Sequence, residues 1–253
     1  MKSAKTAKNL GQIFLRDNNI AKKIVNALYY KKTKKSINVI EVGPGKGILT
    51  QYLLDSNLLI IEIDSLYVNL LRKKFPNLKK RILNVDFLKF NPLDFNLTNF
   101  IIIGNFPYSI SSQILFYILK YKDFISECIG MFPKKIGERI VNKKNLSGLT
   151  ILIKSYFKTK YLFTVNNSVF SPKPKIKSAV IKIIKRENKK NINYSILHKV
   201  VKTAFNQRRK KLKNSLKYIL FQKNFRNNPI FQKRVEQLSV KDFTYISRKV
   251  IRK

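Results

Sequence analysis

The sequence has 253 residues, of which 53 are Lys or Arg and 13 are Asp or Glu, which gives a net charge of +40 at pH 7. Hydrophobic residues make up 44% and aromatic residues 12%, which is enough for a folded core and excludes a wholly disordered basic chain. The single Cys excludes an internal disulfide framework, and the single His excludes a histidine-rich metal site, so we expect no metal.

The charge excess has two explanations. Lys, Asn, Ile and Phe are abundant and can all be encoded by codons of A and T alone, so part of the excess can reflect genome composition. Clustered Lys and Arg also displace the counterions that surround phosphates, and a charge of +40 favours a nucleic-acid partner. The longest apolar runs fall far short of the roughly 20 residues of a membrane span, so we expect no membrane partner.

Apolar strand-like runs alternate with helical patterns from about residue 37 to residue 184. The predicted strands are residues 38–42, 58–63, 81–85, 100–103, 125–132, 161–165 and 178–184. The predicted helices are residues 48–55, 65–75, 111–121 and 149–157. Because the strands are apolar throughout and helices separate them, the pattern predicts an α/β, Rossmann-like domain with a parallel sheet covered on both faces.

A polar run at residues 186–191 separates this region from one in which apolar residues recur only at helical spacing. We therefore expect two domains, an α/β domain at residues 1–186 and a small all-helical domain at residues 187–253. No secretory signal begins the chain, so we expect a cytoplasmic protein. Cys128 is expected in the core, His198 at the surface or between helices, and Tyr29 and Tyr30 in the core and at a helix end.

Three successive predicted strands end in residues suited to a nucleoside ligand. The first runs into a tight turn with Gly43 and Gly45, and glycines permit positive φ and close approach of the backbone to a ligand. The second ends in Glu62, whose carboxylate can accept hydrogen bonds from two ribose hydroxyls, and the third is followed by Asp86, which can meet an adenine edge. These ends converge at one edge of the sheet, which predicts a nucleoside cofactor.

The fourth strand ends in the motif Asn105-Phe106-Pro107-Tyr108. The Asn carboxamide offers an acceptor to an amine, and the proline fixes the backbone so that a carbonyl can point at the same amine. An aromatic side chain can stack on a flipped base. This set resembles the signature of amino-group methyltransferases that act on adenine.

With these motifs, the chain resembles the KsgA-type dimethyladenosine transferases of small-subunit ribosomal RNA over nearly its whole length. The cofactor and target motifs match, and three further segments are similar to family sequence boxes. Those segments are residues 11–15, 170–180 and 204–216. The resemblance implies a class I methyltransferase domain at residues 1–186 and a helical RNA-binding domain at residues 187–253.

The resemblance also implies S-adenosylmethionine as cofactor and two adjacent adenines in a 3′-terminal hairpin of 16S-type rRNA as substrate. Each adenine would be dimethylated during small-subunit biogenesis. Because nothing in the sequence suggests an obligate dimer, we expect a monomer. The implied catalytic residues are Asn105, Pro107 and Tyr108, and those binding cofactor are Ile13, Leu15, Gly43, Gly45, Glu62, Asp86 and Asn105. The residues expected to stack on the target base are Phe106, Tyr108 and Phe170. Those expected to bind RNA are Arg208, Arg209, Lys210, Lys211 and Lys213.

The sequence departs from the family pattern at some positions, and two alternative functions stay open. Ile13 replaces the usual Asn, which removes a side-chain contact to cofactor but leaves the backbone carbonyl. One alternative is a large-subunit rRNA methyltransferase of the macrolide-resistance type, against which Pro44 and residues 207–216 argue. The other is a non-catalytic ribosome-assembly protein, against which the intact Glu62, Asp86 and Asn105 argue.

Overall fold

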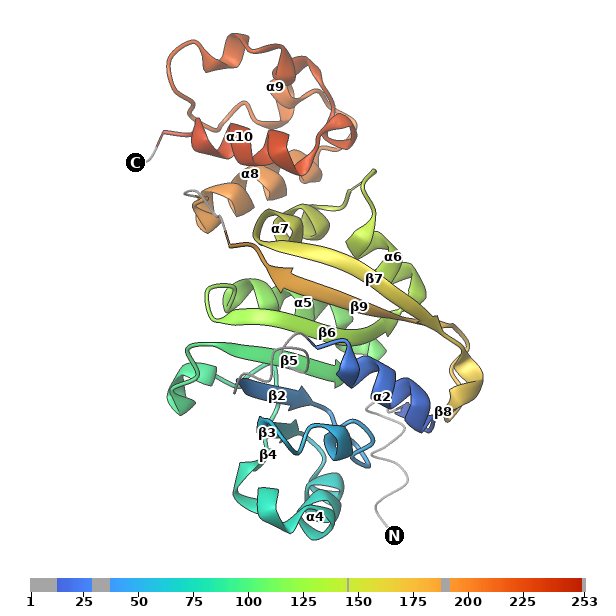
Figure 1. Ribbon diagram of the computed structural model, residues 1–253. Coiled ribbons are helices and arrows are strands. Elements are labelled where there is room, and N and C mark those ends of the chain that lie inside the picture. Colours follow the sequence, from blue (N-terminus) through green and yellow to red (C-terminus); the bar gives the residue numbers. More distant parts are fainter. Residues whose placement is uncertain (1–12, 29–36, 145, 188–191, 252–253) are drawn as a thin grey trace. The chain divides into compact units, whose positions relative to one another are not determined.

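The computed structural model describes residues 13–28, 37–144, 146–187 and 192–251 (Figure 1). The chain divides into two compact units. The α/β unit is residues 1–138 with 159–185, and the helical unit is residues 139–158 with 186–253. Gly11, Gln12, Tyr29 and Tyr30 lie outside the described residues, so the predictions made for them stay predictions.

Seven strands form the main sheet within the described residues, in the order β4-β3-β2-β5-β6-β9-β7. They are β2 (Asn38–Val42), β3 (Asn57–Glu62), β4 (Ile82–Asn84), β5 (Phe100–Asn105), β6 (Ile125–Pro133), β7 (Phe157–Val165) and β9 (Ser178–Lys185). A second, two-stranded sheet pairs β1 (Phe14–Leu15) with β8 (Phe170–Ser171) in antiparallel register.

The prediction of a parallel sheet is correct for β4, β3, β2, β5 and β6, which pair in parallel. It is wrong for β9, which runs antiparallel to β6. A strand that runs parallel to the strand before it needs a crossover connection, usually a helix. Between β7 and β9 the chain forms only short turns and β8. The sheet is therefore mixed.

Both faces of the main sheet are covered, as the uninterrupted apolar strands predicted. Figure 1 shows helix α2 (Asn18–Asn26) on one face of the sheet and α5 (Ser111–Lys120) on the other. On the α2 side, Ile24 packs in one core cluster with Val39 and Ile101. The remaining helices of this region are α4 (Ser65–Lys74) and α6 (Lys134–Val141).

The predicted helix at residues 48–55 is wrong. The structure has a single 3₁₀ turn there, Thr50–Tyr52. The amides of Tyr52 and Leu53 bond to carbonyls three residues back, those of Leu49 and Thr50. Leu49 and Leu53 are buried as a helix would bury them, which explains the misleading pattern. Further 3₁₀ turns are Pro76–Arg81, Pro92–Phe95, Tyr108–Ile110 and Asn167–Val169.

The helical unit contains α7 (Gly148–Tyr156), α8 (Tyr194–Asn206), α9 (Leu212–Ser215) and α10 (Val240–Arg248). It also has 3₁₀ turns at Phe225–Asn227, Pro229–Gln232 and Val235–Gln237. Phe205 of α8 stacks on Phe243 of α10, with ring centroids 5.9 Å apart. The sequence pattern assigned residues 149–157 to the α/β domain, whereas α7 belongs to this unit.

None of the helices in the described part of the chain combines the length and apolarity that a membrane span requires. Among the same residues, no group of three or more His, Cys, Asp or Glu side chains is placed to hold a metal ion.

Candidate functional site

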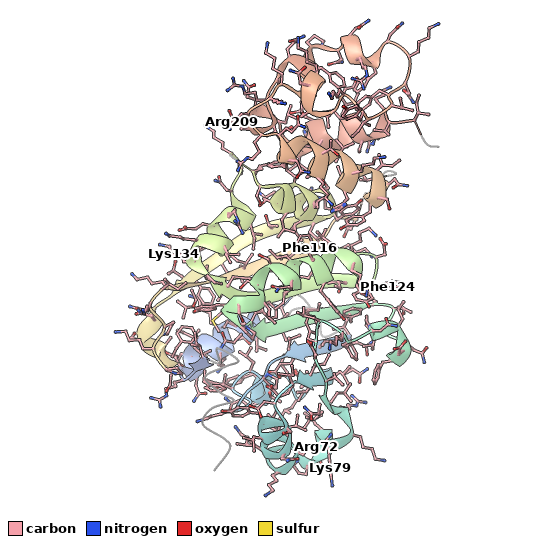
Figure 2. All side chains as sticks on the ribbon, turned by 180° about the vertical axis from the view of Figure 1, so that it is seen from behind. Arg72, Lys79, Phe116, Phe124, Lys134 and Arg209 are labelled. Carbon is pink, nitrogen blue, oxygen red and sulfur yellow. The ribbon has the colours of Figure 1, made fainter. Side chains whose placement is uncertain are left out.

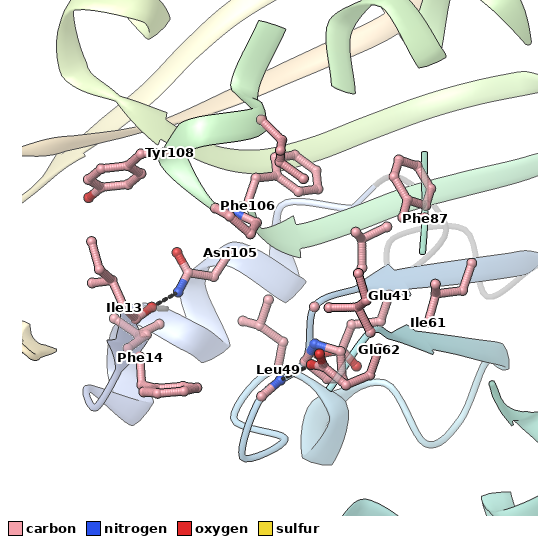
Figure 3. A pocket seen from close by; sticks show the side chains of 18 of the residues that line it. Ile13, Phe14, Glu41, Leu49, Ile61, Glu62, Phe87, Asn105, Phe106 and Tyr108 are labelled. Atoms are coloured by element: carbon pink, nitrogen blue, oxygen red, sulfur yellow. Dashed lines mark hydrogen bonds between the residues drawn. The ribbon is translucent and has the colours of Figure 1, made fainter. Parts of the chain in front are cut away.

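A cavity of about 270 Å³ lies where β2, β3 and β5 end, as Figure 3 shows in close view. Its walls come from five separate stretches of chain, so it is built by the fold and not by one local motif. These stretches are residues 13–15, 41–49, 61–63, 85–88 and 105–110. The convergence of strand ends expected from the sequence is confirmed.

The glycine turn after β2 holds a backbone shape that side chains would disturb. Gly43 has φ 62° and Gly45 has φ 55°, both in the left-handed region that favours glycine. A Cβ on Gly45 would lie 2.7 Å from Cε1 of Phe14, so that position has no room for a side chain. Phe14, which the sequence analysis did not single out, forms part of the cavity wall against this turn.

Glu62 is fixed at the end of β3 by the backbone around it. Its Oε2 accepts a hydrogen bond from the amide of Gly45 at 3.2 Å, and its Oε1 accepts one from the amide of Asp64 at 3.0 Å. The side chain is 4% exposed, and burial raises its pKa above the ordinary value. The carboxylate therefore links the glycine turn to β3 and keeps lone pairs for a ligand in the cavity.

Glu41 is a cavity residue that the sequence reasoning missed. It lies within β2, is fully buried, and accepts a hydrogen bond from the Thr50 hydroxyl at 2.7 Å through Oε2. Its Oε1 is buried with no hydrogen-bond partner among the described residues. Burial raises its pKa from 4.5 to about 8. The signal in the sequence is a carboxylate inside an otherwise apolar strand, which is rare without a purpose.

Asp86 follows β4 and lines the same cavity. Its Oδ1 accepts a hydrogen bond from the amide of Leu88 at 2.9 Å, which fixes the side chain in a tight turn. The next residue, Phe87, is buried and packs on Tyr117 with ring centroids 4.1 Å apart. The turn is thus anchored by an apolar neighbour while Asp86 stays partly exposed.

Asn105 ends β5 and is tied to the segment before α2. Its Nδ2 donates a hydrogen bond to the carbonyl of Ile13 at 2.7 Å, and Figure 3 shows Oδ1 on the opposite side of the carboxamide. The Ile13 carbonyl, which the sequence analysis left available for a cofactor, is thus used to orient Asn105. Leu15, two residues on, is buried and pairs with Phe170 in the small sheet.

Tyr108 is held by a residue far along the chain. Its hydroxyl is hydrogen-bonded to the hydroxyl of Ser178, the first residue of β9, and Ser178 is fully buried. Burial raises the pKa of the Tyr108 hydroxyl, which stays protonated at neutral pH. Pro107, the residue before Tyr108, has φ −56° and ψ 131°, and both residues line the cavity.

Two of the three predicted stacking residues, Phe106 and Phe170, are buried, although Phe106 lines the cavity. Phe106 is 1% exposed, and its ring lies 5.2 Å from that of Phe132, under Gly130, where a Cβ would come within 1.9 Å of it. Phe170 is 3% exposed and belongs to the core cluster. Stacking by either ring would require it to leave the core, whereas Tyr108 is half-buried at the cavity.

The basic residues predicted to bind RNA lie in the helical unit and are exposed. They are Arg208, Arg209, Lys210, Lys211 and Lys213. Figure 2 labels Arg209 on this unit. The segment was expected to be helical, but α8 ends at Asn206 and α9 begins at Leu212, so most of it forms the turn between them.

Cys128 is fully buried in β6, as predicted. His198 lies in α8 and its ring stacks on Tyr194, with centroids 5.8 Å apart, which fits the predicted structural role.

Comparison with known proteins agrees with this geometry. Residues 3–251 match the family described as "Ribosomal RNA adenine dimethylase". The chain is 45% identical over 257 residues to the Flavobacterium johnsoniae protein named "Ribosomal RNA small subunit methyltransferase A", covering 99% of this chain and 97% of the relative. A Cytophaga hutchinsonii protein of the same name is 44% identical over 251 residues, covering 96% of each.

Two solved structures share the fold. A dimethyladenosine transferase from Plasmodium falciparum has a TM-score of 0.76 at 24% identity, covering 94% of this chain and 99% of that chain. The 23S rRNA methyltransferase ErmE has a TM-score of 0.73 at 22% identity, covering 93% and 98%. The predicted Rossmann-like methyltransferase fold is thereby confirmed.

Proposed function

The chain belongs to the ribosomal RNA adenine dimethylase family, and from this premise we propose how its residues perform the reaction. The protein is an S-adenosylmethionine-dependent enzyme that methylates the N6 amine of adenine in small-subunit rRNA. One observation carries the proposal: Asn105, Pro107 and Tyr108 line the same cavity as Glu62 and Asp86. A non-catalytic assembly protein would not need this convergence.

The choice of subunit follows from the relatives. Proteins 41–45% identical to this chain are named for the small subunit, whereas the likeness to the large-subunit enzyme ErmE is a likeness of fold at 22% identity. We therefore propose the small-subunit substrate, with two adjacent adenines of a 3′-terminal hairpin as the targets. The experiment below distinguishes this substrate from large-subunit RNA, which is the alternative.

The cavity fits S-adenosylmethionine on three observations. Gly45 has no room for a Cβ, Glu62 presents a carboxylate with both oxygens oriented, and Oε1 of Glu41 is a buried polar atom without a hydrogen-bond partner among the described residues. We assign Glu62 to the ribose hydroxyls and Asp86 to the adenine edge. The remaining contacts would come from Ile13, Leu15, Gly43, Gly45 and Asn105. When bound, S-adenosylmethionine supplies an electrophilic methyl group on sulfur.

Asn105 and Pro107 act on the target amine. The lone pair of an adenine amine is delocalised into the ring, which makes the nitrogen a poor nucleophile. Hydrogen bonds from its two N–H groups to Oδ1 of Asn105 and to the Pro107 carbonyl favour a pyramidal nitrogen with a localised lone pair. Because Nδ2 of Asn105 is held by the Ile13 carbonyl, Oδ1 is the atom left to accept. Orientation of this kind supplies several kcal/mol to a reaction barrier.

Tyr108 supports the target base, and no side chain need remove the proton. We assign base stacking to Tyr108, whose hydroxyl is fixed by Ser178 while its ring borders the cavity. Neither His nor Cys occurs among the described residues that line the cavity. The proton of the methylated amine, which has become acidic, leaves to water.

The finer assignments rest on charge and on family membership. We assign RNA phosphate contacts to Arg208, Arg209, Lys210, Lys211 and Lys213, which makes residues 187–253 the RNA-binding part and residues 1–186 the methyltransferase part. We further propose a monomer that works without a metal, in the cytoplasm, during small-subunit biogenesis. The relatives' bacterial rRNA substrate supports that setting.

The test is methyl transfer from labelled cofactor to small-subunit and large-subunit RNA, presented separately. Incorporation into the small-subunit RNA alone supports the proposal. Incorporation into the large-subunit RNA alone would move the protein to the alternative substrate, and cofactor binding without transfer to either would indicate the non-catalytic alternative.

A further inference from the structure

A second cavity, of about 460 Å³, lies on the helical unit, and none of the residues assigned to catalysis lines it. Its most unusual feature is Tyr218, whose side chain is 83% exposed, the highest value among the large hydrophobic residues of the described chain. Leu220 and Ile251 on the same cavity are 54% and 48% exposed. Three large apolar side chains are thus held in water around one hollow, an arrangement that marks binding sites on many proteins.

The exposed position of Tyr218 is fixed by the structure around it. Nη2 of Arg226 donates hydrogen bonds to the carbonyls of Lys217 and Ile219, both at 2.7 Å, and to that of Leu216 at 3.3 Å. These bonds bind the turn on both sides of Tyr218 to one guanidinium group. A rigid turn that displays an aromatic ring loses little conformational entropy when a ligand stacks on it.

The neighbouring rim is fixed as well. The amide of Ile251 donates to the carbonyl of Leu220 at 3.0 Å, and a β-bridge joins Phe221 to Val250. Buried Val200 and Ile219 lie behind these residues and also line the cavity. The cavity is therefore apolar at its base. Its edge is formed by two segments distant in the sequence, around Leu220 and around Ile251, which are hydrogen-bonded to each other.

The charges around the hollow select an anionic ligand. The ammonium of Lys217 lies over one face of the Tyr218 ring, 4.6 Å from its centroid, and Lys199 of α8 lines the cavity. No acidic residue occurs among the described residues that line it. An exposed ring with an ammonium over one face suits a heterocyclic base joined to phosphates, because the base can stack on the opposite face while the phosphates meet the lysines.

We propose that this cavity is a nucleobase-stacking subsite for an unpaired nucleotide of RNA, centred on Tyr218 and separate from the methylation cavity. Its role is to bind a single-stranded part of the RNA while the target adenine is bound in the methylation cavity. Stacking is tolerant of base identity, since every base has a π-face, so the subsite adds affinity without reading sequence.

The experiment uses the full-length protein and two probes: an oligouridine of about ten nucleotides, and an abasic oligomer with the same number of phosphates. Neither probe contains adenine, so neither presents the methylation target. The wild type is expected to bind the oligouridine about tenfold more tightly than the abasic oligomer. Tyr218→Ala is expected to remove most of that difference, and Tyr218→Phe to keep it, because stacking needs the ring and not the hydroxyl.

Phe116→Ala is the matched control. Phe116 is 48% exposed on α5 of the other unit and is labelled in Figure 2, so the substitution removes a comparable exposed ring from outside the subsite. It should leave the difference between the probes intact. The proposal is overturned if Tyr218→Ala weakens binding to both probes equally, or changes neither, as it would if the hollow served a protein partner. Methyl transfer activity is scored separately, so failure here would not count against the proposed reaction.

Discussion

Asn105 has two tasks at the residue scale, because one end of its carboxamide holds the Ile13 carbonyl and the other is left for the target amine. We predict that Asn105→Ala nearly abolishes methyl transfer while cofactor binding persists. Asn105→Asp should be equally inactive, since a carboxylate cannot donate to the Ile13 carbonyl and would face it with like partial charge.

Single-turnover methylation and calorimetric cofactor titration, run on both variants, check this prediction. Near-normal turnover by Asn105→Ala would remove the residue from the mechanism. Loss of cofactor binding together with turnover would show that the essential contact of Asn105 is with the cofactor and not with the target amine.

Glu62 gives a second residue-scale prediction. Glu62→Ala should weaken S-adenosylmethionine binding by more than about 1 kcal/mol, because charge-assisted hydrogen bonds to the ribose are removed. Glu62→Gln preserves the shape and should lose less, although one amide hydrogen would then face a backbone N–H of Gly45 or Asp64. Isothermal titration measures both, and wild-type affinity in the Ala variant would show that β3 does not hold the ribose.

The raised pKa of Glu41 predicts that the stability of the folded protein depends on pH. Its pKa is raised from 4.5 to about 8 by burial in the fold, so the folded state binds the proton more tightly than the unfolded state. This contribution is complete below about pH 4.5 and is lost as the pH rises through about 8. Relative to Glu41→Gln, the ligand-free wild type should therefore lose stability between these limits, on the order of a few kcal/mol.

Chemical denaturation of both proteins at several pH values gives the comparison. Glu62 is present in both, so its own contribution cancels except for its repulsion of the Glu41 carboxylate, which is one of the causes that raise the pKa of Glu41. A constant difference in unfolding free energy across the range would show that Glu41 is ionised in the folded protein.

At the scale of elements, the turn between α8 and α9 carries the basic residues Arg208, Arg209 and Lys210. Replacing all three with Ala should weaken RNA binding and flatten the plot of log affinity against log salt. The slope should fall by slightly less than one unit for each RNA phosphate that the variant no longer neutralises. The affinity for S-adenosylmethionine should not change. All three side chains are exposed, so the fold should tolerate the change.

Filter binding over a range of salt concentrations measures the slope, with circular dichroism as the folding control. If affinity and slope both match the wild type, this turn does not bind RNA, and the surface of the α/β unit becomes the main candidate.

The strand ends were predictable from the sequence because each apolar run stops where its ligand-type residue begins, as at Glu62 and Asp86. The direction of β9 was not, since an apolar run reads the same in both directions and only pairing with β6 decides it. The bond from Asn105 to Ile13 joins residues 92 positions apart, and no local pattern indicates such a contact. The burial of the Phe106 ring was not predictable either, because a motif names residues without saying which ring is buried.

At the scale of the whole molecule, the sequence predicted an α/β part followed by a helical part, because the hydrophobic period changes after residue 186. It did not predict that residues 139–158 belong to the helical unit. Helix α7 is buried along most of its length, and an apolar helix carries no signal of which neighbour will bury it.

The central claim is that this chain dimethylates adenine N6 in small-subunit rRNA through the Asn105–Tyr108 motif. The most direct measurement is mass spectrometry of nucleosides and mapped fragments from immature small subunits incubated with the protein and S-adenosylmethionine. The account predicts N6,N6-dimethyladenosine at two adjacent positions near the 3′ end, absent when Asn105→Ala replaces the wild type. Methylation of a different base or atom, or dimethyladenosine formed equally well by Asn105→Ala, would contradict it.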